Sequence, residues 1–118
     1  LKYSTAGFHV KPVYIENKEI EELAAGKLPI SKAFSYQKEL REDIDLEFKD
    51  DSTLFLSTDG LIEEINNGQI YNKRHYKILK EKHDSSAEEI AAAVEKDFKR
   101  FMDHQKAADD VTFMVFKF

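Results

Sequence analysis

Two strongly β-forming runs in this chain each have aspartate at one end, and together they constrain the fold more than any other feature. The two aspartate segments, Asp59 and Asp109-Asp110, are called the acidic steps below. The first run, residues 53–58 (TLFLST), is followed by Asp59, and the second, residues 111–116 (VTFMVF), is preceded by Asp109. Runs this rich in β-branched and aromatic side chains are typical of buried strands. If the two strands are antiparallel neighbours in one sheet, the end of the first lies beside the start of the second.

That arrangement would bring the carboxylates of Asp59 and Asp109 into one small region. Two like charges held close together are unfavourable unless a cation neutralises them. Mg²⁺ and Mn²⁺ suit a site that is built from oxygen ligands and retains water. A plainer interpretation is also open, because Asp-Gly after a strand is commonly a turn, and Asp109 and Asp110 fit a solvated pair.

Composition and charge indicate one domain and disfavour several kinds of partner. At 118 residues the chain is long enough for one hydrophobic core. Its net charge is −5, with Lys and Arg scattered among the acids, so we expect neither nucleic acid nor membrane insertion. No apolar run approaches the roughly 20 residues that span a bilayer.

Cysteine and histidine, the other common metal-binding and catalytic residues, do not form a second candidate site in this sequence. The chain has no cysteine, which excludes disulfides and thiolate chemistry and fits a cytoplasmic location. The histidines show no i, i+4 pair and no zinc-like spacing, so we expect them to be exposed or at the edge of the core. They are His9, His75, His83 and His104.

Local patterns predict further strands. Residues 13–15 and 20–23 are expected to form a hairpin around a polar turn, and a break is expected at Ala6-Gly7. Alternation of apolar and polar residues predicts half-buried strands at Phe34 and Tyr36, then at Ile44, Leu46 and Phe48. The final strand, residues 111–116, is predicted to be buried on both faces because its apolar run is nearly continuous.

Helices are predicted between the two acidic steps. Leu61, Ile62 and Ile65 indicate one or two helical turns, followed by a loop at residues 66–68. Residues 73–82 form a short helix, and residues 87–102 carry a long apolar stripe at helical spacing. A capping box begins the long helix, from either Ser85 with Glu88 or Ser86 with Glu89. Strands, two helices and a last strand make an α+β layered domain.

The order of several motifs resembles a known family. The chain resembles the C-terminal half of SpoIIE/RsbU-type phosphatases, which belong to the PPM class of metal-dependent protein Ser/Thr phosphatases. The resemblance spans essentially the whole chain and indicates that residues 1–118 are the C-terminal portion of such a domain. The motifs that carry it are YSTAG at residues 3–7, GKLPI at 26–30, LFLSTDGLIE at 54–63, Asn66 and DDVT at 109–112.

The resemblance implies a fold and a site. The family fold is an antiparallel β-sandwich flanked by helices, with two Mn²⁺ or Mg²⁺ ions bridged by water at one end. By resemblance, Asp59 and Asp109 are metal ligands and carry the catalysis, and Asp110 is the neighbour of a ligand. Glu63 matches a second-shell position that orients a metal-bound water. An exposed carboxylate at a helix start is the other interpretation of Glu63.

The implied mechanism is hydrolysis by a water that two metal ions activate. The water attacks phosphorus in line while the cations offset charge on the phosphoryl oxygens. The protein supplies carboxylates and no covalent nucleophile.

The chain departs from the family pattern in ways that affect the site. It has Ala6-Gly7-Phe8-His9 where the family has Ala-Gly-His, and Ser31 where Gly is usual. The family's D-x-S-G-H-G segment, which supplies the Asp that bridges both metals, is absent from these residues. We therefore expect an incomplete two-metal site, and little or no activity from residues 1–118 alone. The strand-like start at Leu1 also suggests the downstream part of a longer protein.

Three functions remain in contention. The first is a protein Ser/Thr phosphatase in bacterial signalling, acting on a STAS-like anti-anti-sigma-factor phosphoprotein and controlled by an upstream sensor or receiver domain. The second is a non-catalytic PPM-like binding or regulatory module. The third is an unrelated α+β interaction domain whose acidic steps are only turns.

Overall fold

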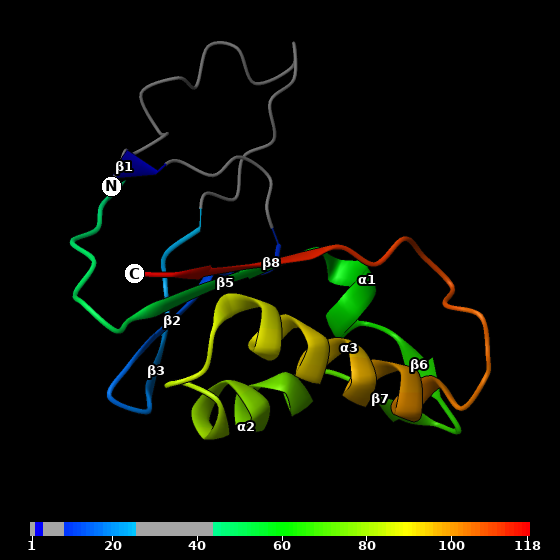
Figure 1. Cartoon of the computed structure of the whole chain (residues 1–118). Helices are drawn as coiled ribbons and strands as arrows, with labels where there is room; N and C mark the ends of the chain where they lie inside the picture. The colour runs from blue at the N-terminus through cyan, green and yellow to red at the C-terminus, as the bar shows by residue number, and fades with distance from the viewer. Residues whose placement is uncertain (1, 4–8, 26–43) are drawn as a thin grey trace, which may run out of the picture.

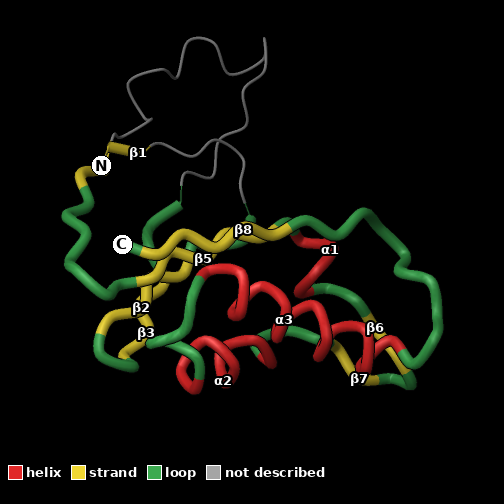
Figure 2. The backbone as a smooth tube through the Cα atoms, viewed as in Figure 1, coloured by secondary structure: helices red, strands yellow, loops and turns green. Residues whose placement is uncertain are grey.

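A computed structural model describes residues 2–3, 9–25 and 44–118 of the chain, and these residues form helices packed on an antiparallel sheet (Figures 1 and 2). The main sheet has four strands in the order β3-β2-β5-β8. Their bounds are β2 Val13–Glu16, β3 Glu19–Glu22, β5 Thr53–Ser57 and β8 Phe113–Lys117. The α+β class predicted from the sequence is confirmed.

The hairpin of β2 and β3 forms where the sequence predicts it. Val13 pairs with Glu22, and Glu16 pairs with Glu19. The two residues between the strands, Asn17 and Lys18, have positive φ angles of 49° and 67°. Positive φ at both central residues is the geometry of a tight turn that matches the twist of its strands.

Strands β5 and β8 are antiparallel neighbours, which is the arrangement that would bring Asp59 and Asp109 together. Thr53 pairs with Lys117 at one end of the ladder, and Ser57 pairs with Phe113 at the other. The end of β5 therefore lies beside the start of β8. This register determines where Asp59 and Asp109 are found.

Three helices accompany the sheet. A capping box at Ser86 begins the long helix α3, since its hydroxyl accepts the N–H of Glu89 (3.2 Å) and the Glu89 carboxylate accepts the N–H of Ser86 (3.0 Å). Helices α2 and α3 contact each other, α2 contacts β3 and α3 contacts β8, so both cover the same face of the sheet (Figure 1). The bounds are α1 Asp59–Ile62, α2 Arg74–Glu81 and α3 Ala87–Met102.

The main core lies between this helical layer and the sheet. Tyr71, which precedes α2, is fully buried there and donates its hydroxyl to Asp97 of α3 (3.1 Å). Burial, together with the Asp97 carboxylate, raises the pKa of Tyr71 and keeps the hydroxyl protonated. The other buried residues of this cluster are Val13, Ile15, Phe55, Leu61, Leu79, Ile90, Val94, Phe101 and Met102.

A smaller apolar cluster lies on the opposite face of the sheet, around Tyr14, Leu23 and Leu54. The prediction that the last strand is buried on both faces is wrong, because Met114 is 54% exposed and Phe116 is 43% exposed on this side. Strand β8 is an edge strand of the described sheet, and its alternate residues face the helices. A continuous apolar run does not reveal which face has a neighbour.

The segment after α1 also differs from its prediction. Ile65 is not helical but begins a small hairpin, and the predicted loop is its tight turn, with φ angles of 50° at Asn67 and 74° at Gly68. The strand predicted at Ile44, Leu46 and Phe48 ends after Asp45. Short strands complete the fold: β1 Lys2–Tyr3 pairs with β4 Ile44–Asp45, and β6 Ile65–Asn66 pairs with β7 Gln69–Ile70.

Several predicted features lie outside the described residues, namely the break at Ala6-Gly7 and the strand at Phe34 and Tyr36. The motif at residues 26–30 is also outside them. Within the described part of the chain, no helix combines the length and apolar character needed to cross a bilayer.

Candidate metal centre

Strand β5 passes into α1 without a connecting loop, and this junction fixes Asp59. Thr58 has extended backbone angles at the N-cap position, and Asp59 is the first residue of the helix. The Asp59 carboxylate accepts the N–H of Gly60 through Oδ1 (3.0 Å). An acidic side chain in the first turn is also favoured by the free N–H groups there. Asp59 is therefore held at the tip of a buried strand.

Thr58 connects this tip to the segment before β8. Its N–H donates to the carbonyl of Thr112 (2.9 Å), and its Oγ1 accepts the N–H of Thr112 (3.1 Å). The carbonyl oxygens of Asp110 and Thr112 each lie 3.3 Å from the same Oγ1, so the hydroxyl proton has an acceptor. These bonds fix residues 110–112 against the end of β5.

Gly60 brings the two acidic steps into direct contact. A Cβ atom on Gly60 would lie 2.3 Å from the carbonyl oxygen of Asp110 and 3.6 Å from the Cβ of Asp109. The first distance is far below any van der Waals contact, so only glycine allows this approach. The first turn of α1 therefore packs on the backbone of Asp110 and against the Cβ of Asp109.

Asp109 is oriented in the same way as Asp59. Its Oδ1 accepts the N–H of Asp110 (2.7 Å). In the described part of the chain, no hydrogen bond or ion pair engages Oδ2 of Asp59 or Asp109. Free carboxylate oxygens at the start of α1 and in the segment before β8 are the donors that Mg²⁺ and Mn²⁺ prefer, so the residues present fit such an ion.

The pair alone does not complete a site. Among the described residues, no group of three or more His, Cys, Asp or Glu side chains could hold a metal ion. Carboxylates from another segment would be needed to surround two ions.

Glu63 and Asp110, which the resemblance placed next to the metal ligands, occupy different positions. Glu63 is exposed at the end of α1, where its N–H donates to the carbonyl of Asp59 (2.8 Å), and its side chain lines a cavity of about 280 Å³ together with Asp109. The side chain of Asp110 is exposed, and the contacts of this residue with Gly60 and Thr58 come from its backbone.

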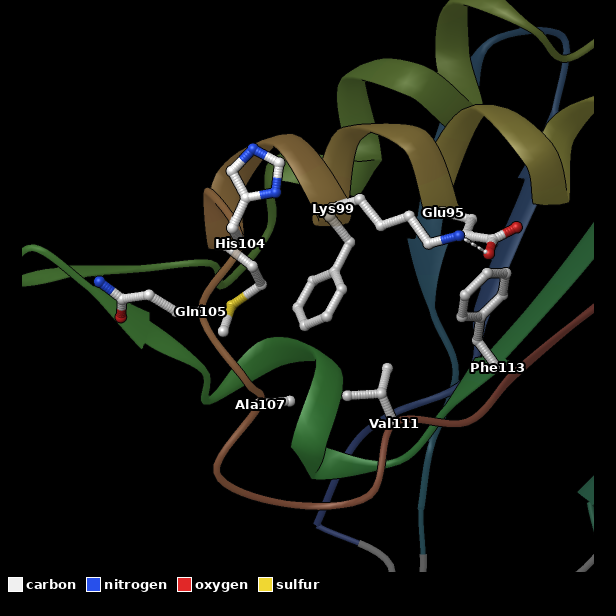
Figure 3. A pocket seen from close by; sticks show the side chains of 9 residues that line it. Glu95, Lys99, His104, Gln105, Ala107, Val111 and Phe113 are labelled. Carbon is white, nitrogen blue, oxygen red and sulfur yellow. Dashed lines mark hydrogen bonds and ion pairs between the residues drawn. The ribbon is translucent and has the colours of Figure 1, made fainter.

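A larger cavity of about 550 Å³ lies on the other side of residues 103–112, the segment that joins α3 to β8 and is called the Asp109 loop below. Figure 3 shows Lys99 and Glu95 of α3 on one side of this cavity, and Ala107 and Val111 of the Asp109 loop on the other. The side of the Asp109 loop that faces α3 therefore borders open space along part of its length.

Comparison with known proteins identifies the family. The family model for Stage II sporulation protein E (SpoIIE) matches residues 1–118. The chain belongs to the SpoIIE family. No curated protein sequence matches it.

Solved structures of phosphatase domains share the fold of this SpoIIE-family chain. The SiaA-PP2C domain of Pseudomonas aeruginosa superposes with a TM-score of 0.75 at 18% identity, over 94% of this chain and 44% of that one. The PP2C phosphatase domain of Bacillus subtilis SpoIIE, solved with a fragment of its regulatory domain, gives 0.69 at 20% identity, over 97% and 32%. The manganese-presoaked SpoIIE phosphatase domain of the same organism gives 0.67 at 16% identity, over 99% and 55%.

These likenesses confirm the fold that the resemblance implied, a mixed architecture of helices and antiparallel sheet of the PP2C type. The chain spans about a third to just over half of the length of each of these three solved chains.

Two buried polar residues of the SpoIIE-family chain near the site were not predicted. Glu64 is 7% exposed and accepts the N–H of Ala108 (2.9 Å), and Asn66 is 5% exposed and donates to the carbonyl of Phe101 (2.6 Å). Asn66 belongs to the motifs that carry the resemblance, but no role was assigned to it. Glu64 stands next to Glu63, which is exposed, and nothing local marks which of the two is buried.

The histidines are mostly placed as predicted. His9 and His104 are exposed and His83 is half-buried. His75 contradicts the expectation, because it lies in the core with 2% exposure, stacked on Phe55 with ring centroids 4.9 Å apart. Burial lowers the pKa of His75 to about 4, so the ring is neutral near pH 7.

Proposed function

We propose that residues 1–118 are the C-terminal portion of a PPM-type phosphatase domain that hydrolyses phosphoserine or phosphothreonine in a protein substrate. One observation supports the proposal: Gly60 packs on the backbone of Asp110, which brings Asp59, at the start of α1, close to Asp109 in the loop before β8. Membership of the SpoIIE family and the PP2C-type fold support the reaction class.

Asp59 and Asp109 would hold Mn²⁺ or Mg²⁺ with their carboxylates. When bound, these ions supply an acidified water and offset charge on the phosphoryl oxygens during in-line hydrolysis. The bonds from Oδ1 to the N–H groups of Gly60 and Asp110 keep each carboxylate oriented, so little reorganisation accompanies binding. Glu63 accepts a hydrogen bond from water in the cavity that it shares with Asp109.

The substrate proposed is a STAS-like phosphoprotein of the anti-anti-sigma-factor type, in the bacterial cytoplasm. An upstream sensor or receiver domain would control the phosphatase. The Bacillus subtilis relative of known structure includes a fragment of a regulatory domain, which supports this organisation.

The first test measures binding of Mn²⁺ to the chain, followed by its effect on thermal unfolding. An ion that binds only the folded state stabilises it by about 2.7 kcal/mol at a hundred times its dissociation constant. Asp59→Asn and Asp109→Asn should each remove most of this stabilisation, because an amide is a weaker ligand than a carboxylate. Asp50→Asn, at an exposed residue in the turn before β5, is the matched control. Binding that is indifferent to both site substitutions would refute the assignment.

The second test measures phosphatase activity in the full-length protein. A phosphorylated STAS-domain protein is the substrate, and release of phosphate with Mn²⁺ or Mg²⁺ is the readout. The same two substitutions should abolish turnover. If the full-length protein binds the ions through Asp59 and Asp109 but releases no phosphate, the non-catalytic binding module becomes the better account.

Residues 1–118 alone are expected to show little turnover, because the Asp that bridges both metals in the family has no counterpart among them. Robust metal-dependent activity from these residues would show that the site needs no further carboxylate.

A further inference from the structure

We infer that Glu64 is a positioning residue, whose buried carboxylate holds the Asp109 loop in place by accepting the N–H of Ala108. Ala108 immediately precedes Asp109, and the two atoms of the hydrogen bond are 2.9 Å apart. The consequence for metal binding rests on the proposed function, whereas the anchoring of the loop does not.

Apolar packing gives the Asp109 loop little support. Residues 103–106 and 108–110 are exposed, and only Ala107 and Val111 are half-buried. On the side of α3, the loop borders the cavity of about 550 Å³ (Figure 3). A segment with few buried apolar contacts opens at low free energy unless polar bonds hold it.

Three polar connections, all from residues 58–66, hold the loop. Asn66 binds the carbonyl of Phe101 just before the loop, and Thr58 binds Thr112 at its end. The bond between Glu64 and Ala108 lies between these two ends. Without it, the residues between Ala107, which packs against the core, and Asp110 would have no hydrogen bond to residues 58–66 in the described part of the chain.

Glu64 is itself well fixed. Its carbonyl accepts the N–H of Tyr71 (2.8 Å), and Tyr71 is fully buried and bonded to Asp97 of α3. The residue is 7% exposed, and a hydrogen bond to a charged acceptor is about twice as strong as a neutral one. The bond therefore connects the Asp109 loop to the core. The adjacent Glu63 is exposed and makes no such connection in the described part of the chain.

Amide hydrogen exchange at Ala108 tests the anchoring without any metal. Glu64→Ala removes the acceptor and should accelerate exchange roughly tenfold to a hundredfold, the order expected when a hydrogen bond to a charged group is lost. Glu64→Gln keeps an acceptor oxygen and should retain most of the protection. Glu63→Ala is the matched control and should leave the amide unchanged. The amide of Ile90 in α3 reports whether global stability has fallen.

Glu64→Asp provides a second variant if Glu64→Ala does not fold. Its carboxylate keeps the charge but is one methylene shorter, so exchange at Ala108 should again rise while Ile90 stays protected. Equal exchange at Ala108 in the wild type, Glu64→Ala and Glu64→Asp would overturn the inference.

Titration with Mn²⁺ then tests the consequence for Asp109. Glu64→Ala should raise the dissociation constant by about tenfold, in the range found when supporting residues of metal ligands are removed, and Glu64→Gln should restore most of the affinity. Unchanged affinity in Glu64→Ala would overturn the positioning role. A wild type that binds no Mn²⁺ would instead refute the proposed function, and the exchange data would still decide the anchoring.

Discussion

Thr58 and Thr112 hydrogen-bond to each other in both directions, and this pair fixes the relation between the two acidic steps. The N–H of Thr58 donates to the carbonyl of Thr112 (2.9 Å), and the N–H of Thr112 donates to Oγ1 of Thr58 (3.1 Å). The second bond uses a side chain where the β5–β8 ladder would otherwise use a backbone carbonyl. The backbone of β5 is thereby free to turn into α1, while the segment that follows Asp109 stays attached.

Thr58→Val should therefore loosen the site without changing the shape of the side chain. The N–H of Thr112 and the carbonyl of Asp110 would lose their partner, and because both residues are exposed the cost is about 0.5–1.5 kcal/mol in the free energy of unfolding. Chemical denaturation measures this loss, and Mn²⁺ affinity should fall with it. Thr58→Ser keeps the hydroxyl and is the control. Equal stability of the valine and serine variants would contradict the role assigned to Oγ1.

Gly60→Ala should separate α1 from the Asp109 loop. The added methyl group would lie 2.3 Å from the carbonyl oxygen of Asp110, which is backbone and cannot rotate away. Overpacking of this kind typically costs about 1–3 kcal/mol, and here it also moves Asp59 relative to Asp109. The variant should therefore unfold at a lower temperature in thermal unfolding and bind Mn²⁺ more weakly in titration.

Gly68→Asn is the matched control for the glycine substitution. A Cβ on Gly68 meets nothing within 4 Å, and asparagine tolerates its φ of 74° better than other residues. Its stability should stay close to that of the wild type, with metal binding unchanged. A Gly60→Ala variant that behaves like Gly68→Asn would show that the contact with Asp110 can relax.

The sequence predicted those parts of the structure whose causes are local. The apolar runs before Asp59 and after Asp109 predicted two strands, whereas their antiparallel pairing was a condition that only the structure supplies. The capping box at Ser86 needs only residues three apart, so it is visible without the fold. Asn67-Gly68 is also a strong turn signal, but the strands it joins have two residues each and leave no periodic pattern.

Features that depend on distant neighbours were not predictable in this way. Glu64 is buried because the Asp109 loop, some forty residues later in the chain, passes over it. Met114 and Phe116 are exposed because, in the described part of the chain, the helices cover the opposite face of β8, where Phe113 and Val115 pack, and the composition of the strand does not reveal this. In both cases the deciding contact lies in another segment of the chain.

Ser86→Ala should weaken the start of α3 without affecting the candidate metal centre. The substitution removes the acceptor for the N–H of Glu89, and loss of an N-cap typically costs about 1 kcal/mol. Ser85, the other residue predicted as a possible cap, provides the control, and Ser85→Ala should cost no more than about 0.5 kcal/mol. Unfolding in denaturant measures both. A reversed order would show that the helix begins at Ser85.

His75 should make the stability of the protein dependent on pH in the mildly acidic range. Its ring lies among Phe55, Tyr71 and Tyr76, and burial, assisted by the nearby Lys73 cation, lowers its pKa from 6.5 to about 4. Between these two values the unfolded chain binds a proton at this residue and the folded chain does not. Stability therefore decreases as the pH falls from about 6.5 to about 4, and the contribution of His75 is complete above that range.

His75→Phe tests this prediction, because phenylalanine fits an aromatic cluster and does not titrate. The whole effect of His75 is on the order of 3 kcal/mol, since one pKa unit corresponds to about 1.4 kcal/mol. Carboxylates titrate in the same range in both proteins, so the informative quantity is the difference between their unfolding free energies at each pH. That difference should be constant between pH 7 and 8 and should shift in favour of His75→Phe as the pH falls to 4. Parallel profiles would mean that His75 is protonated equally easily in the folded and unfolded chains.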